Sequence, residues 1–392
     1  MPNRRTLFVI ACLGMLSFGI ALTTLGAVLP SVIERFGIDT AAAGSLFPLL
    51  TFGILVGSLV FGPIVDRNGY KGMLVLATAL IVVGLEGIAF APSMTWLRVA
   101  IALIGFGSGI INGGTSALVA DISSDERTAG LSLLGVFFGV GAVGVPFALG
   151  SLLGAFSYST IIAAVGALVV IPLALTALTT FPAPKQPQGF PLAAAQGLVR
   201  DPILLLMGLM LFLASGMEIT VGGWTATFFK DELQIPDRRA LVYLSLYWFG
   251  MMLGRLALSS AVRRIAPARV LLGCLSIAFA GALLLILTRS ASLAAVSVFL
   301  LGCGFAASFP VVLGLVGDRY AQLSGTAFSI VIVMALTGGM IVPYTTGVLG
   351  ASYGLRSSFV IVPIALVLFA LLLTVTTARL GTRPTPIGVR VE

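Results

Sequence analysis

The chain has 392 residues, of which 58% are hydrophobic and 9% are charged, whereas about a quarter of the residues of a water-soluble domain are charged. This composition excludes an ordinary soluble domain. The net charge of +8 is scattered over short polar breaks instead of forming a patch that would bind nucleic acid. The chain has no histidine, and its three cysteines lie apart in apolar stretches, so the sequence predicts no metal site, no disulfide and no cofactor.

Apolar runs recur along the chain, each long enough to cross a lipid bilayer as a helix. In chain order they cover residues 6–33, 41–65, 71–92, 95–120, 128–154, 157–181, 202–229, 240–262, 268–288, 292–317, 323–350 and 356–378. The proline-rich segment 182–200 falls between the sixth run and the seventh. The sequence therefore predicts an all-α membrane protein with twelve transmembrane helices. We expect two six-helix bundles, residues 1–181 and 201–392, joined by a cytoplasmic linker.

The two halves are copies of one unit, displaced by the 197 residues that separate Phe52 from Phe249. Residues that fall into register without a gap include Gly26 with Gly223, Gly105 with Gly302, Asp121 with Asp318, and Pro146 with Pro343. Constant spacing over such a length indicates a duplicated architecture. Two halves that enclose one site near the bilayer midplane are typical of membrane transporters.

Positive residues predict the orientation of the chain. Most of the 22 lysines and arginines lie at the amino terminus, in the even-numbered breaks and in the carboxyl-terminal tail. Cytoplasmic segments of membrane proteins carry an excess of these residues. We therefore expect both termini to lie in the cytoplasm and the chain to lie in a bacterial inner membrane, as a monomer.

Three ionisable residues fall well inside the predicted spans: Glu86, Glu218 and Arg255. Such residues are costly in lipid and mark functional sites by default. Glu218 falls near the middle of its span, and Arg255 can reach toward it from the next span. Their repeat partners are Ala21 and Ser58, so both charges are additions to the second half. The pair is either a switch or a permanent structural contact. Glu86 lies near the end of its span, which favours a structural or peripheral role.

Polar and aromatic residues near the same depth complete a candidate substrate site. With Glu218 and Arg255, this set comprises Thr24, Asn112, Trp224, Tyr247 and Trp248. Aromatic faces beside hydrogen-bonding groups suit sugars and other small polar organic molecules. Glu218 is in addition the candidate for proton coupling, because it is a buried carboxylate at midplane depth.

The loop between the second and third spans reads Gly62-Pro-Ile-Val-Asp66-Arg67-Asn-Gly69-Tyr-Lys71. It resembles the signature loop of the major facilitator superfamily, G-x3-D-R-x-G-x-[RK], at every fixed position. The resemblance implies two six-helix bundles around a central cavity that opens to alternate sides.

In the superfamily this loop latches one state, which implies a gating role for Asp66, Arg67 and Lys71. Asp121 and Asp318 end the fourth and tenth spans and are expected to join the same network. The second half has Arg263-Arg264 where the first has Asp66-Arg67, so only the first half carries the full latch.

Within the superfamily, the second half resembles the fucose permease type of sugar transporter. The matching residues are Gly254-Arg255, Ser308-Phe-Pro310 and Gly338-Gly339 with Pro343. Proton-coupled permeases of that type carry an aspartate in the first helix and a glutamate in the fourth. This chain has Gly26 and Asn112 there, so coupling must use another acid, such as Glu218, or be absent.

These observations favour a secondary transporter of a small polar solute, most simply a sugar, with or without coupled protons. A drug or metabolite efflux antiporter is the alternative, favoured by the methionine-bearing spans with Met210, Met217, Met251 and Met252. A non-transporting membrane sensor would need a long tail or loop to signal through, and we see neither. No catalytic residue set is visible, so we do not expect an enzyme. Substrate identity, transport direction and the coupling ion stay open.

Overall fold

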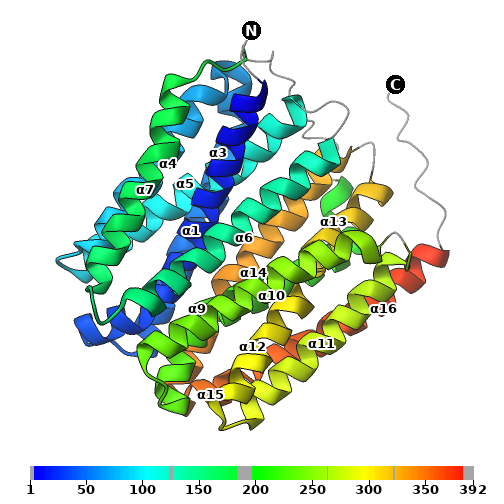
Figure 1. Cartoon of the computed structure of the whole chain (residues 1–392). Helices are drawn as coiled ribbons and strands as arrows, with labels where there is room; N and C mark the ends of the chain where they lie inside the picture. Colours follow the sequence, from blue (N-terminus) through cyan, green and yellow to red (C-terminus); the bar gives the residue numbers. More distant parts are fainter. Residues whose placement is uncertain (1–3, 123–126, 183–196, 263, 321–322, 383–392) are drawn as a thin grey trace.

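The computed structural model (Figure 1) describes the chain apart from residues 1–3, 123–126, 183–196, 263, 321–322 and 383–392. The regular elements of the described residues are helices. In chain order they are α1 (Arg4–Phe36), α2 (Thr40–Gly44), α3 (Leu46–Asn68), α4 (Tyr70–Ala89), α5 (Met94–Ile122), α6 (Arg127–Leu152), α7 (Tyr158–Leu178), α9 (Pro202–Leu233), α10 (Asp237–Ala261), α11 (Pro267–Leu287), α12 (Ala291–Phe305), α13 (Ser308–Arg319), α14 (Ser324–Tyr353), α15 (Leu355–Ser358) and α16 (Ile361–Thr382).

Within the described residues, these helices form twelve spans that are long and apolar enough to cross a membrane. The prediction of an all-α protein with twelve such spans is confirmed. Three of the spans are made of two consecutive helices: α2 with α3, α12 with α13, and α15 with α16. Most of the expected linker, residues 182–200, lies outside the described residues.

Prolines account for the three interruptions. Pro310 and Pro363 each stand four residues after the first residue of a break, and Pro48 stands three residues after Ser45, which separates α2 from α3. A proline has no N–H to donate to the carbonyl four residues earlier, and its ring collides with that carbonyl. The result is a short break in the helix, most deeply placed at the α12–α13 junction in the tenth span.

Helices of each half pack closely on one another. In the first half α5 packs on α3 and α4, and α1 packs on α6; in the second half α12 packs on α10 and α11, and α14 packs on α9. The same backbone contact holds both halves together. A Cβ on Gly105 would overlap the carbonyl oxygen of Leu50, and a Cβ on Gly302 would overlap that of Tyr247. These are equivalent positions of the repeat, so glycine permits the same close helix approach twice.

The halves meet along three pairs of spans: α1 with α9, α6 with α10, and α14 with the span made of α2 and α3. The first pair joins the first helix of each repeat, and the other two pairs are equivalent under the repeat. α1 and α9 touch at Gly26, where a Cβ would overlap the backbone of Gly222 and Gly223. Gly26 and Gly223 are repeat partners, so this contact lies near the axis that relates the two halves.

Candidate functional site

An ion pair between a buried carboxylate and a half-buried arginine joins α9 and α10 in the second half. Glu218 is at the centre of α9, and Arg255 lies in the last third of α10. Oε1 of Glu218 is 4.0 Å from Nη2 of Arg255, and the two side chains are 11% and 30% exposed. The structure therefore brings together the two charges that the sequence predicted to be within reach. At 4.0 Å the contact is electrostatic and too long for a hydrogen bond.

Arg255 also contacts the first half of the chain. Its Cζ lies 5.5 Å from the centre of the Phe138 ring of α6, a distance at which a guanidinium is attracted to an aromatic face. The Nε atom of Arg255 is buried and has no hydrogen-bond partner among the described residues. A buried donor without a partner is costly, so this N–H is available to an acceptor atom of a ligand.

The neighbouring aromatic residues form a wall beside this pair. Trp248 meets Phe138 edge-on with ring centres 6.3 Å apart, and Phe18 of α1 lies 5.3 Å from the same ring. The indole Nε1 of Trp248 is a second buried donor with no partner in the described part of the chain. Tyr247 is fully buried, and its hydroxyl donates to the backbone carbonyl of Glu218 over 3.2 Å. Two buried N–H donors without a partner among the described residues thus belong to side chains that contact one aromatic ring, at the contact between α6 and α10.

The other predicted site residues differ in exposure and in whether their side chains already donate a hydrogen bond. Asn112 is exposed on α5. Thr24 is buried, and its hydroxyl donates to the carbonyl of Ile20 within the same helix, at 2.7 Å. Trp224 is buried too, and its indole donates to the carbonyl of Pro343 over 2.9 Å. The side-chain donors of Thr24 and Trp224 are therefore occupied, whereas Asn112 remains accessible.

Trp224 lies where the halves touch. Its ring centre is 5.6 Å from that of Phe47 in α3, and it contacts the backbone positions Gly44 and Gly347. The indole fills the space between α9, α14 and the α2–α3 span. Trp224 is thus part of the packing that joins the halves toward the end of the molecule away from the termini.

That end is held closed by several bonds across the halves. Nζ of Lys230 lies 2.9 Å from Oε2 of Glu34. The hydroxyl of Thr40 donates to the carbonyl of Gly347 over 3.0 Å, and Arg238 donates from Nε to the carbonyl of Gly150 over 3.4 Å. Gly150 and Gly347 are repeat partners, so the contact on one side of the axis has its counterpart on the other.

The predicted gating residues lie at the opposite end. Asp121 accepts a hydrogen bond from the hydroxyl of Tyr70 over 2.6 Å, which ties α5 to α4 within the first half. Arg67, Lys71 and Asp318 are exposed. In the described part of the chain these three side chains make no hydrogen bond or ion pair with the other half. The side chain of Asp66 lies outside the described residues.

Glu86 is placed away from the central pair. Its carboxylate lies against Gly166 of α7, where a Cβ would collide with it, and its side chain is half-buried in the first half. A structural or peripheral role for Glu86 stays a prediction.

Two features escaped the sequence reasoning. Phe138, which contacts both Arg255 and Trp248, is one of 25 phenylalanines, and nothing in its neighbourhood distinguishes it. The contact between Glu34 and Lys230 could have been found, because Glu34 is one residue beyond Ile33, the repeat partner of Lys230. Repeat partners on the two helices next to the axis must face each other.

Twelve apolar helices in two repeated groups, with a buried charge pair at their centre and one end closed, define the architecture of a membrane transporter. The sequence matches the Major Facilitator Superfamily over residues 11–335, and again over residues 244–389. The chain belongs to this superfamily, and it is a multi-pass membrane protein.

Individual relatives are transporters of several kinds. The uncharacterized transporter y4wD of Sinorhizobium fredii is 24% identical over 366 residues, which cover 92% of this chain and 95% of the relative. Sugar transporter ERD6-like 7 of Arabidopsis thaliana is 31% identical over 150 residues, 38% of this chain and 31% of the relative. The multi-drug resistance efflux pump PmrA homolog of Lactococcus lactis is 29% identical over 180 residues, 44% of each chain.

Among solved structures, the chain is similar to a bacterial homolog of the human lysosomal transporter Spinster, in an inward-facing and unoccupied conformation. The TM-score is 0.81 at 16% identity, and the match covers 99% of this chain and 100% of that chain. A likeness at this level of identity concerns the fold. The superfamily match establishes the transporter class, and the relatives, which include a sugar transporter and an efflux pump, leave the solute open.

Proposed function

We propose that the chain is a secondary transporter that carries a small polar organic solute, a sugar or sugar derivative, across the bacterial inner membrane. The observation that carries this proposal is the pair of buried donors near the Phe138 ring, Arg255 Nε and Trp248 Nε1, which have no hydrogen-bond partner among the described residues. Hydroxyl oxygens of a sugar accept such hydrogen bonds, and the apolar face of a sugar ring packs on an aromatic side chain. The resemblance of the second half to the fucose permease type supports the same solute class.

Transport would proceed by alternating access, with residues 1–181 and 201–392 moving as two bundles. The contacts across the halves at Glu34, Thr40 and Gly150 belong to the end away from the termini. The excess of positive residues at the other end supports a cytoplasmic location for both termini, so this conformation would face inward. When the inner end closes, the loop with Asp66, Arg67 and Lys71, together with Asp121 and Asp318, would form the opposing latch.

Glu218 is our candidate for proton coupling. It is a carboxylate at the centre of a membrane-spanning helix, and its nearest cation, Arg255, is 4.0 Å away. The acid of related permeases in the first helix is replaced here by Gly26, where α1 touches the backbone of α9. Loss of the Glu218 charge on protonation would free Arg255 for the solute and change its hold on Phe138. Solute binding and helix movement would thereby be linked.

Uptake into proteoliposomes under an imposed pH gradient tests the proposal. We expect the wild-type protein to accumulate one member of a monosaccharide panel. Glu218→Gln should still exchange that sugar across the membrane in counterflow without accumulating it. Accumulation by Glu218→Gln at the wild-type level would contradict proton coupling through Glu218. Failure of every sugar in both assays would contradict the solute class.

Efflux of amphipathic compounds is the second candidate function. The site has an apolar side, because Met252 of α10 packs on Gly139 of α6 next to Phe138 and Phe18. A partial relative is named as a multi-drug resistance efflux pump. A thermal-shift screen of the purified protein against sugars, organic acids and drugs separates the two functions, since a ligand stabilises the state that binds it. Raised drug sensitivity of a deletion strain would favour efflux.

A further inference from the structure

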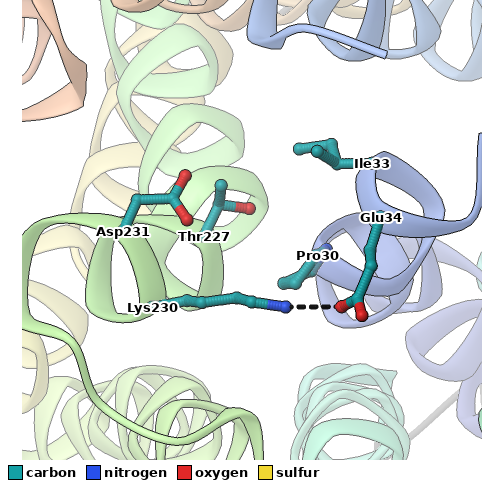
Figure 2. Close-up of a pocket in the computed structure, with 6 residues that line it drawn as sticks. All are labelled: Pro30, Ile33, Glu34, Thr227, Lys230 and Asp231. Carbon is teal, nitrogen blue, oxygen red and sulfur yellow. Dashed lines mark hydrogen bonds and ion pairs between the residues drawn. The ribbon is translucent and has the colours of Figure 1, made fainter. Parts of the chain in front are cut away.

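A cavity lies between α1 and α9, at the closed end and away from the Glu218–Arg255 pair. Its volume is about 350 Å³. The lining residues are Pro30, Ile33 and Glu34 of α1, and Thr227, Lys230 and Asp231 of α9 (Figure 2).

The repeat explains why the cavity is there. Each lining residue of α1 is the repeat partner of one lining residue of α9: Pro30 of Thr227, Ile33 of Lys230, and Glu34 of Asp231. The two helices touch at Gly26 and Gly222, and the cavity lies farther toward the carboxyl-terminal end of both helices. Equivalent stretches of α1 and α9 therefore form its two walls, and we call this cavity the wedge. Differences between the walls arise only from substitutions: α9 carries the polar residues Thr227 and Lys230 where α1 carries proline and isoleucine.

Some of the polar groups in the wedge are already engaged. The ammonium of Lys230 lies 2.9 Å from Glu34 and 3.1 Å from Asp237. Thr227 is 1% exposed, and its hydroxyl oxygen has no hydrogen-bond partner among the described residues. In Figure 2 this hydroxyl points across the gap toward the α1 wall, beside the carboxylate of Asp231. Within the described part of the chain, that carboxylate has no hydrogen bond or ion pair.

The charges determine the kind of ligand. Two carboxylates, Glu34 and Asp231, line the wedge together with the single lining ammonium, that of Lys230. Lys230 is paired with Glu34 and with Asp237, which is outside the lining, so a cation is attracted and an anion is repelled. A bare metal ion does not fit, because metal ions need several oxygen ligands that converge closely. No group of three or more acidic, histidine or cysteine side chains is so placed among the described residues. The wall of Pro30 and Ile33 instead offers apolar contact to a carbon skeleton.

We propose that this wedge is a binding site for a small organic cation that carries a primary ammonium group. The ammonium donates to the Asp231 carboxylate and the Thr227 hydroxyl, neither of which has a side-chain partner among the described residues. The carbon skeleton lies on Pro30 and Ile33. Since each half supplies one wall, an occupant that contacts both walls binds only the conformation in which this end is closed.

Binding of ethanolammonium chloride to the purified full-length protein tests the site, with sodium chloride and choline chloride at equal ionic strength as comparisons. We expect a saturable rise in melting temperature with ethanolammonium, and a much smaller one with choline, which has no N–H to donate. Asp231→Asn and Thr227→Val should each weaken the apparent affinity at least about tenfold, the factor that corresponds to 1.4 kcal/mol. Thr227→Ser should bind like the wild type, because it keeps the hydroxyl.

Glu86→Gln serves as the matched control, since it removes a half-buried carboxylate that lies against Gly166 of α7, outside the lining of this cavity, and it should leave the affinity unchanged. Equal shifts with sodium and ethanolammonium would overturn the proposal, as would unchanged affinity in Asp231→Asn. Absence of any saturable shift in the wild-type protein would overturn it as well. These measurements need no transported solute and are independent of the transport assays.

Discussion

At the scale of single residues, Arg255 is shared between two halves that must move relative to each other. It faces Glu218 at 4.0 Å in its own half and the Phe138 ring at 5.5 Å in the other, and its Nε remains free. Neither contact is a strong bidentate bond, so each can be exchanged for a bond to a solute at modest cost. The residue therefore combines a free donor with a contact to each half.

Replacement of Arg255 by lysine tests the importance of the guanidinium. Arg255→Lys keeps the positive charge near Glu218 and removes the planar group with its Nε donor. We expect the affinity for the solute found in the thermal-shift screen to fall about tenfold or more, with the protein still folded. Arg269→Lys, at an exposed position at the start of α11, is the control. Equal affinity in both variants would contradict a direct contact between Arg255 and the solute.

Replacement of Trp248 by phenylalanine tests the second buried donor, the indole Nε1–H. Trp248→Phe keeps an aromatic ring beside Phe138 and deletes the indole N–H, which has no partner in the described structure. A single hydrogen bond contributes about 0.5–1.5 kcal/mol, so the affinity for the solute should fall roughly 2- to 12-fold. The melting temperature without solute should fall modestly, because phenylalanine leaves part of the buried space of the indole unfilled. A lower melting temperature with unaltered affinity would assign Trp248 a packing role alone.

At the scale of helices, the contact between α1 and α9 is the point about which the halves can turn. Glycine at position 26 lets α1 touch the backbone of α9 at Gly222, and small residues at such a crossing are what closely packed membrane helices require. The bonds that close one end lie beyond this crossing, at Glu34 with Lys230. A change at the crossing should thus affect which end is closed.

Gly26→Ala tests the crossing. A Cβ on residue 26 would overlap the carbonyl of Gly222 in the present conformation, and overpacking of this kind costs about 1–3 kcal/mol. The variant should therefore disfavour this conformation by about 5- to 150-fold relative to the alternative one. Alkylation of cysteines introduced at the closed end reports the change. Gly144→Ala, where a Cβ would meet nothing within 4 Å, should behave like the wild type.

The ion pair between Lys230 and Glu34 contributes less to closing this end than the packing at Gly26 does. The Glu34 side chain is 74% exposed, so solvent screens the pair. Lys230→Met should open the closed end in the same direction as Gly26→Ala, to a smaller extent, and the effect should shrink at high salt. Arg289→Met removes an exposed positive charge at the same end of the molecule and is the control. Equal alkylation in Lys230→Met and the wild type would show that the pair does not hold this end closed.

At the scale of the whole molecule, the sequence predicted the helices and the repeat because both leave a direct pattern. Apolar runs predicted all twelve spans. Gly105 and Gly302, which are 197 residues apart, make equivalent close contacts with the carbonyls of Leu50 and Tyr247. The proximity of Glu218 and Arg255 was predicted because the two residues lie on consecutive spans. The breaks at Pro48, Pro310 and Pro363 were missed, although each proline marks a carbonyl that loses its donor.

Contacts between the halves could not be predicted in the same way. Phe138 meets Arg255 only because α6 packs on α10, and the sequence contains no signal for the facing pair of side chains. Trp224 was predicted as a substrate-site residue from its depth, yet its indole is bonded to Pro343 and lies between the halves. Depth in the membrane follows from position along a helix, whereas the partner of a side chain depends on how the helices pack.

The central claim is that two repeated halves rock about the site at Glu218 and Arg255, closing one end as the other opens. Distances between spin labels at both ends test it most directly. Ala155 with Ser352 at the closed end, and Asn68 with Ile265 at the opposite end, are exposed pairs of repeat partners. Pulsed electron resonance would be recorded on each pair at high and low pH, with and without solute, in the wild type and in Glu218→Gln. We predict that the two distances change in opposite directions and that Glu218→Gln fixes one of the two arrangements at every pH. Distances that stay constant, or that grow and shrink together, would contradict the account.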